Sequence, residues 1–327
     1  MIVILSTFNG HSRLGEMLEA MRRVRIPAGT TIHVVDNGSS DGTPDLVAQF
    51  TDRLPIVQHF QPVRGKNYCL NFALEKLIDR LDPRELIVFT DDDILPSEGW
   101  LEELDASARA HPDCDVFAGS ILPHWPCCGM RHLESVRRHF GILFTLTSHS
   151  EGPVDCAQAW GPNMAVRASV LQAGYRFDPR FGPNGTAGYP MGSETELMER
   201  LDAAGYKAWF VERAYVRHMI RANQTDAVNV VQRAFRHGYG SGLRDQRGHG
   251  VAQLMQCRWK SFRGIAASRL RHTWVAPENR LLQDFNEAWA RGYAIGAEFE
   301  YRNALAKMEF EDEFPERRED LRSHLLD

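Results

Sequence analysis

The sequence Leu86-Ile-Val-Phe-Thr-Asp-Asp-Asp-Ile-Leu-Pro-Ser-Glu-Gly-Trp100 decides the fold class of this chain of 327 residues. Its first four residues form a continuous apolar run, which is typical of a strand buried on both faces. The run is followed by Asp91, Asp92 and Asp93, three carboxylates that repel one another and have low strand propensity. A bound Mg2+ or Mn2+ would relieve this repulsion, because hard cations prefer carboxylate oxygen. The alternative is a solvated acidic turn before Pro96.

Short apolar runs alternate with stretches of helical periodicity over the first two thirds of the chain. We predict strands at 2–5, 31–35, 56–60, 86–89 and 115–121, and an extended run at 205–211. This alternation predicts an α/β fold with a doubly wound, mostly parallel sheet flanked by helices. The dinucleotide-binding Gly-x-Gly-x-x-Gly pattern and the Walker phosphate loop are both missing, which argues against a hydride-transfer enzyme and a loop-type ATPase.

The composition is that of a soluble globular protein, with 43% hydrophobic and 25% charged residues. A net charge of −5 argues against a nucleic-acid partner. The six cysteines show no disulfide-framework spacing, and no stretch has the length of a membrane span. The first residues lack the basic start of a signal peptide. We therefore expect reduced thiols and a cytoplasmic location.

Polar loops follow the first two predicted strands. Residues 6–10 contain Thr7 and Asn9, and residues 36–43 begin with Asp36 and contain two glycines. A carboxylate and an amide beside glycines can bind a nucleoside at close approach, and a turn rich in Asn, Asp and Gly is the alternative. Lys66 begins a later helix, where a basic side chain favours phosphate binding rather than helix stability.

Two further segments carry candidate residues. A helix is predicted from Ser193 through Leu201, with Ser193 as its cap and with Glu194 and Glu196 in its first turn. Acidic residues in this position also suit the helix dipole, so a structural role alone accounts for at least one of them. The segment 124–132 holds the possible zinc ligands His124, Cys127, Cys128 and His132. Their spacing does not match the usual paired pattern, and loop and buried thiols are the alternative.

The chain from residue 221 onward is predicted to be helical. One face is expected to carry Val228, Val231, Phe235 and Tyr239, and another stripe Trp259, Phe262, Ile265 and Ala266. A third is expected to carry Leu282, Phe285, Trp289, Gly292, Tyr293 and Gly296, with the glycines allowing close helix packing. Five cations lie between Arg258 and Arg271. This segment therefore has two interpretations, which are peripheral contact with anionic lipid and core packing with a solvated basic face.

Several motifs occur together in a characteristic order. They are Ser6-Thr-Phe-Asn9, Val35-Asp-Asn-Gly-Ser-Ser-Asp-Gly-Thr43, Gly65-Lys66 through Asn71, Asp91-Asp-Asp93 followed by Pro96 and Trp100, Asn163-Met-Ala-Val-Arg167, and Gly192 to Leu201. In order and spacing the chain resembles the family 2 glycosyltransferases of GT-A fold, which are inverting enzymes. The resemblance covers residues 1–218. It implies a catalytic domain over residues 1–220, followed by a helical region over 221–327.

The resemblance implies a role for each matching residue. The nucleotide-sugar donor would be bound by Thr7, Asn9, Asp36, Lys66, Asp91 and Asp92. Asp93 would hold the Mn2+ or Mg2+ that bridges the diphosphate, and His218 matches a histidine found near the metal in such enzymes. Family members usually have Glu-Asp where this chain has Ser193-Glu194, so the catalytic base falls on Glu194 with a longer side chain. A structural role for His218 is the alternative.

The implied activity is metal-assisted transfer of a sugar, with inversion, from a UDP-sugar or another nucleoside-diphosphate sugar. The acceptor hydroxyl would belong to a glycan, a lipid-linked molecule or a small molecule. Two other functions stay open. A nucleotidylyltransferase would need a basic glycine-rich loop after the first strand, for which residues 8–13 are a poor match, and a non-catalytic nucleotide-sugar-binding module would not need Glu194. The sequence leaves open the sugar, the acceptor and the oligomeric state.

Overall fold

The computed structural model describes residues 1–126 and 130–313. The strands are β1 Ile2–Thr7, β2 Thr31–Asp36, β3 Ile56–Phe60, β4 Leu86–Thr90, β5 Ile94–Pro96, β6 Val116–His124, β7 Gly152–Val154, β8 Met164–Arg167 and β9 Ala208–Met219. The α-helices are α1 His11–Met21, α2 Thr43–Ala48, α3 Lys66–Leu77, α4 Trp100–Ala110, α5 Phe140–Phe144, α6 Ala168–Gln172, α7 Ser193–Ala203, α8 Ala227–Gln246, α9 Val251–His272 and α10 Arg280–Glu313.

The chain divides into two compact units. The first contains the sheet and helices α1 to α7, and it ends at Ala222. The second contains α8 to α10 and, among the described residues, two earlier stretches, 130–139 and Thr186–Gly192. The second unit therefore combines the helices that follow Ala222 with short segments from the middle of the chain.

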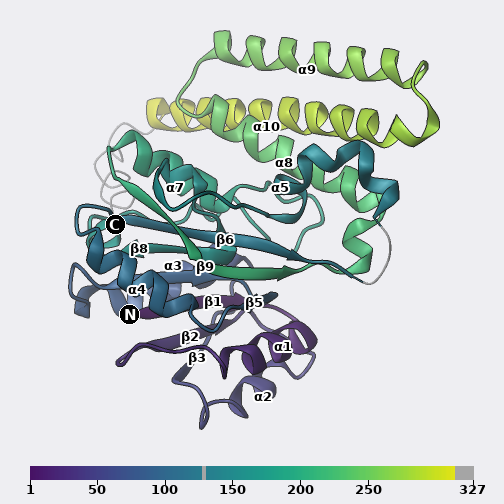
Figure 1. Cartoon of the computed structure of the whole chain (residues 1–327). Coiled ribbons are helices and arrows are strands. Elements are labelled where there is room, and N and C mark those ends of the chain that lie inside the picture. Colours follow the sequence, from purple (N-terminus) through teal and green to yellow (C-terminus); the bar gives the residue numbers. More distant parts are fainter. Residues whose placement is uncertain (127–129, 314–327) are drawn as a thin grey trace. The chain divides into compact units, whose positions relative to one another are not determined.

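The first unit is built on one mixed sheet (Figure 1). The strand order is β3-β2-β1-β4-β8-β6-β9-β5, and β7 pairs with β9. Strands β3, β2, β1 and β4 are parallel, whereas β8 runs antiparallel between β4 and β6. Strand β6 pairs in parallel with β9, and the two short edge strands are antiparallel to β9. The α/β fold class is thus confirmed, with the parallel half carrying the polar strand ends.

Helices cover both faces of this sheet, so the sheet is doubly wound. On one face, Leu14 and Leu18 of α1 and Trp100 of α4 pack against Val3 and Leu5. On the other face, residues of α3 and α7 pack against alternate residues of the same strand, such as Ile2 and Ile4. Every residue of β4 is buried, as the apolar run predicts for a central strand.

The second unit has an unusually close helix crossing. Gly292 and Gly296 of α10 lie against the backbone of α8, and a Cβ at either position would lie 2.1 Å from a carbonyl oxygen of that helix. Gly238 and Gly242 of α8 lie equally close to carbonyl oxygens of α10. Helix α9 also packs against α10 and runs alongside it (Figure 1). These glycines allow the close helix packing because they leave room for the neighbouring backbone.

Not all of the apolar residues that were predicted to share a helix face in this unit are buried. Val228 of α8 is 67% exposed, and the buried side of the helix is instead formed by residues such as Val230 and Ala234. In α9, Trp259 and Phe262 are exposed, whereas Leu254 and Cys257 are buried. Periodicity identifies residues that share a face, but it does not determine which face another helix covers.

Candidate active site

Three parallel strands bring the predicted donor residues to one edge of the sheet. In the ladder, Thr7 at the end of β1 lies opposite Asp36 at the end of β2. On the other side of β1, Leu5 lies opposite Thr90, the residue that precedes Asp91. The carboxyl ends of such strands are where open α/β sheets bind ligands. The site is thus built from residues far apart in the sequence.

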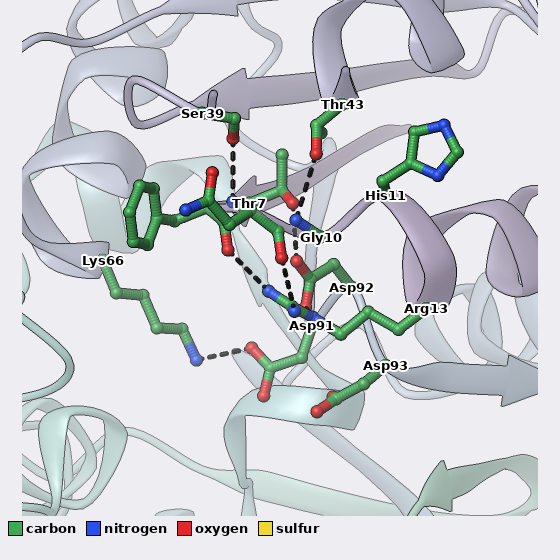
Figure 2. A network of polar contacts seen from close by, with 12 residues as sticks. Thr7, Gly10, His11, Arg13, Ser39, Thr43, Lys66, Asp91, Asp92 and Asp93 are labelled. Atoms are coloured by element: carbon green, nitrogen blue, oxygen red, sulfur yellow. Dashed lines mark hydrogen bonds and ion pairs between the residues drawn. The ribbon is translucent and has the colours of Figure 1, made fainter. Parts of the chain in front are cut away.

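Asp92 organises the first loop of this edge. Its carboxylate accepts a hydrogen bond of 2.6 Å from Thr7 Oγ1 and one of 2.7 Å from Arg13 Nε (Figure 2). Burial raises the pKa of Asp92 to about 6, although both bonds oppose that change. A Cβ on Gly10 would lie 2.4 Å from Thr7 Oγ1, so the loop closes over the carboxylate only with glycine there. The sequence patterns did not mark Arg13 as a site residue.

The loops that follow β1 and β2 hold each other. Asn9 has a left-handed backbone with φ of 46°, and its Oδ1 accepts a hydrogen bond of 2.8 Å from the Ser40 backbone N–H. The Asn9 N–H donates to Ser39 Oγ. The Asp36 carboxylate accepts hydrogen bonds from the backbone N–H groups of Gly38 and Ser39. Both predicted nucleoside-binding residues are therefore held in fixed positions.

Lys66 joins the two candidate residues most important for chemistry. Its Nζ donates to Asp91 Oδ1 and to Glu194 Oε1, each at 2.6 Å, and Figure 2 shows the first of these contacts. Burial opposes ionisation of Glu194, but Lys66 outweighs it and lowers the pKa of that carboxyl. For Asp91 burial dominates, and its pKa is raised despite Lys66. Glu194 is thereby kept ionised, which a proton acceptor requires.

The backbone near Gly161 allows this arrangement. A Cβ on Gly161 would lie 2.3 Å from Glu194 Oε1 and 3.1 Å from Lys66 Nζ, so a side chain there would displace the ion pair. The neighbouring Asn163 is fully buried and donates from Nδ2 to the carbonyl oxygens of Ser120 and Ala214. A backbone segment held this firmly provides one wall of the site.

Asn67 positions the start of α7. Its Oδ1 accepts a hydrogen bond of 2.6 Å from Ser193 Oγ, and its Nδ2 donates to the carbonyl oxygens of Asp178 and Phe181. Ser193 is the first residue of α7, and its hydroxyl donates to Asn67 of α3. The contact fixes the helix that carries Glu194 relative to the helix that begins with Lys66.

Glu196 has a separate role. It is buried, and its two carboxylate oxygens accept hydrogen bonds from Arg200 Nε and Nη2 at 2.8 and 2.9 Å. Arg200 also donates to the carbonyl oxygen of Arg176. Residues two apart on a helix point in different directions, and here only Glu194 contacts Lys66. Glu196 is engaged in holding the helix.

Asp93, the residue before β5, lies close to His218 of the neighbouring strand β9. His218 Nε2 is 3.4 Å from Asp93 Oδ1, and His218 Nδ1 is 2.6 Å from the carbonyl oxygen of Phe144. A carbonyl only accepts, so Nδ1 carries a hydrogen and Nε2 faces the carboxylate. Burial opposes ionisation of Asp93, but His218, Arg13 and Arg221 outweigh it and lower the pKa. This pairing of a carbonyl-anchored imidazole with a carboxylate is a donor set that fits a divalent cation.

The described residues contain no group of three or more His, Cys, Asp or Glu side chains arranged to hold a metal ion. Two protein ligands would leave further coordination positions for a diphosphate and water, as is usual for Mg2+. The zinc hypothesis is not tested, because Cys127 and Cys128 lie outside the described residues. His132 Nε2 is 2.9 Å from the carbonyl oxygen of Thr225. The described cysteines, Cys69, Cys114, Cys156 and Cys257, are free and buried.

Comparison with known proteins identifies the family. The model for "Glycosyl transferase family 2" matches residues 2–172, and the chain belongs to this family. A search of curated proteins found no match.

Solved structures share the fold. The mannosyltransferase PcManGT from Pyrobaculum calidifontis, in complex with GDP-Man and Mn2+, has a TM-score of 0.57 at 17% identity, covering 89% of this chain and 86% of its own. TarS 1-349 from S. aureus in complex with UDP-GlcNAc has a TM-score of 0.52 at 15% identity, covering 93% and 91%. At such identities the likeness establishes the GT-A fold alone.

Proposed function

We propose that this protein transfers a sugar from a nucleoside-diphosphate sugar to an acceptor hydroxyl, with inversion at the anomeric carbon and Glu194 as the general base. The observation that carries the proposal is the Lys66 ammonium, which contacts both Asp91 and Glu194 at 2.6 Å. It places an ionised carboxylate beside the strand ends where a donor would bind. The catalytic domain of the proposal spans residues 1–220, and residues 221–327 form the helical region.

The proposed reaction needs only one displacement. Glu194 accepts the proton of the acceptor hydroxyl while the oxygen attacks the anomeric carbon from the side opposite the diphosphate. The carbon–oxygen bond to the diphosphate breaks as the new bond forms, so the configuration inverts. Lys66, held between Glu194 and Asp91, keeps the base ionised before the acceptor enters. A carboxylate whose pKa is lowered is a weaker base. The reaction barrier therefore also depends on how Glu194 is positioned relative to the acceptor hydroxyl.

The donor pocket of the proposal uses the ordered loops at the strand ends. Asp36 and Asn9 would bind the nucleoside, Asp91 would contact the ribose side, and Thr7 and Asp92 would shape the wall. A Mn2+ or Mg2+ held by Asp93 and His218 would offset the charge that develops on the leaving diphosphate. The structural relatives with bound UDP-GlcNAc and GDP-Man make UDP-sugars and GDP-mannose the first donors to test. Family membership argues against the nucleotidylyltransferase alternative.

Donor binding and turnover test the proposal directly. The protein is titrated with a panel of UDP-, GDP- and other nucleotide sugars by calorimetry, and release of free nucleoside diphosphate is scored with Mn2+, with Mg2+ and with chelator. We expect donor binding that falls sharply with chelator and recovers on metal addition. Binding of donor with no turnover toward any acceptor would instead favour a non-catalytic module. No binding of any nucleotide sugar would overturn the proposal.

Asp93→Ala tests the metal ligand, and Asp113→Ala is its control. Asp113 lies in the same unit and is an exposed carboxylate paired with Lys207. We expect Asp93→Ala to lose the metal-dependent part of donor binding with the fold retained, and Asp113→Ala to behave as wild type. Metal-dependent binding that survives in Asp93→Ala would exclude this residue as a ligand. The anomeric configuration of the product, read by NMR, tests inversion.

A further inference from the structure

Helix α9 has its large apolar residues on the outside. Val251, Met255, Trp259, Phe262 and Leu270 are between 57% and 67% exposed. At 100° per residue these five positions fall within one arc of the helix surface. The opposite side packs through small or short residues, such as Cys257, Ser261 and Ser268. A soluble helix normally buries its large apolar residues, so an exposed stripe of this kind indicates a partner.

The aromatic pair on this stripe is preorganised. The rings of Trp259 and Phe262 stack with centroids 5.7 Å apart and an interplanar angle of 22°. Trp274, just beyond the end of α9, is 84% exposed. Tryptophan and phenylalanine on one face of an amphipathic helix are characteristic of helices that lie in a membrane interface.

The charge of α9 is entirely of one sign. Its residues from Val251 to His272 include five arginines and lysines and no aspartate or glutamate. By helical geometry, Arg258 lies just beyond one edge of the apolar arc and Arg263 just beyond the other, while Arg269 lies at the same angle as Val251. Arg269 pairs with Glu287, whereas no described side chain forms an ion pair with Arg258 or Arg263. This arrangement matches an anionic surface that also accepts apolar side chains.

We propose that the exposed face of α9 binds anionic lipid, with Trp259 and Phe262 inserted at the headgroup level and Arg258 and Arg263 facing lipid phosphates. A second copy of the same face is disfavoured, because two such faces would bring like charges together. Among the described residues, no helix is long and apolar enough to cross a membrane. The helix would therefore lie on the bilayer. The proposal does not depend on catalysis and concerns the second unit alone.

Vesicle co-sedimentation of the full chain tests the proposal. One vesicle preparation is phosphatidylcholine alone, and the other contains about 30% phosphatidylglycerol, each at low and at high salt. We expect binding to the anionic vesicles that weakens with salt. Trp259→Ser combined with Phe262→Ser should lower the partition coefficient about 10-fold or more. Arg258→Gln combined with Arg263→Gln should lower it about 30-fold.

Phe60→Ser is the matched control, because Phe60 is 60% exposed and lies in the other unit. It should bind vesicles as wild type does. Absence of binding at low salt, or equal loss in Phe60→Ser and in the α9 variants, would overturn the proposal. Sedimentation velocity tests whether this face is instead used for self-association. A wild-type dimer that Trp259→Ser with Phe262→Ser dissociates would assign the face to self-association and overturn the lipid assignment.

Discussion

The two units depart from ordinary protein composition in opposite ways. The first buries charge, since Asp91, Asp92 and Asp93 follow the fully buried strand β4 and Lys66 is enclosed between two carboxylates. The second exposes apolar surface, since α9 presents Trp259 to the outside. Buried charges cost free energy unless they are paired, and exposed apolar stripes add nothing to folding. Each departure therefore points to something other than stability: reaction chemistry in the first unit and a binding surface in the second.

The two units also differ in how their elements pack. In the first unit, side chains such as Leu14 and Trp100 fill the space between helix and sheet. In the second, glycines bring the backbones of α8 and α10 into contact. The second unit thus depends on close backbone approach, where one added methyl group has no room. The predictions below test each side of this contrast.

The largest effect is expected for Glu194→Gln. The amide still accepts a hydrogen bond from Lys66, but it cannot accept a proton from the acceptor. Turnover should fall about 10²–10⁴-fold with donor affinity nearly unchanged. Steady-state kinetics with the best donor from the panel, together with calorimetric donor binding, measure both quantities.

Glu196→Gln is the matched control on the same helix. Glu196 is bonded to Arg200, so its loss should destabilise the fold by about 1–3 kcal/mol with little change in turnover. A near-native rate in Glu194→Gln, or abolished chemistry in Glu196→Gln with donor binding preserved, would show that the base is assigned to the wrong residue.

The next effect is on stability. Gly292→Ala places a Cβ 2.1 Å from the Phe235 carbonyl oxygen, so α8 and α10 must separate. We expect a loss of about 3 kcal/mol in the free energy of unfolding, measured by urea denaturation. Gly264→Ala in α9 is the control, because its Cβ meets only the Ala290 methyl at 3.2 Å. Helix propensity gains up to about 1 kcal/mol there, so equal destabilisation by both variants would contradict the close crossing.

The sequence predicts the first unit better than the second for a physical reason. An apolar run that ends in three carboxylates is a strong local signal, and β4 lies where it predicts. The contacts from Lys66 to Glu194 and from Asn67 to Ser193 join residues more than 120 positions apart, and no local pattern contains them. Short strands such as β5 have too few residues to show the alternating apolar and polar pattern by which a strand is predicted. The sequence contains the glycines of α8 and α10, but it does not indicate which helix packs against them.

A smaller effect concerns pH. Burial, together with the charges of Arg244, Arg233 and His139, lowers the pKa of His237 to about 4, and Trp289 Nε1 donates a hydrogen bond to its Nδ1 at 3.0 Å. Between about pH 6.5 and 4 the unfolded chain gains a proton that the folded chain excludes. Stability should fall by about 2 kcal/mol as the pH drops through this window. His237→Gln keeps an acceptor for Trp289 and should flatten this part of the curve. An unchanged pH dependence in that variant would assign the effect to other groups.

The smallest expected effect completes the comparison. Trp259→Ser and Phe262→Ser replace side chains that are 61% exposed, so each should change the free energy of unfolding by no more than about 0.5 kcal/mol. Leu254→Ala on the opposite side of α9 removes a side chain that is only 6% exposed and should cost about 2–3 kcal/mol. Urea denaturation of the three variants measures the difference. If Trp259→Ser cost as much as Leu254→Ala, the aromatic residue would belong to the folded core of the helical unit. A near-zero change in the free energy of unfolding together with lost vesicle binding would mean that the apolar stripe of α9 serves binding and does not stabilise the fold.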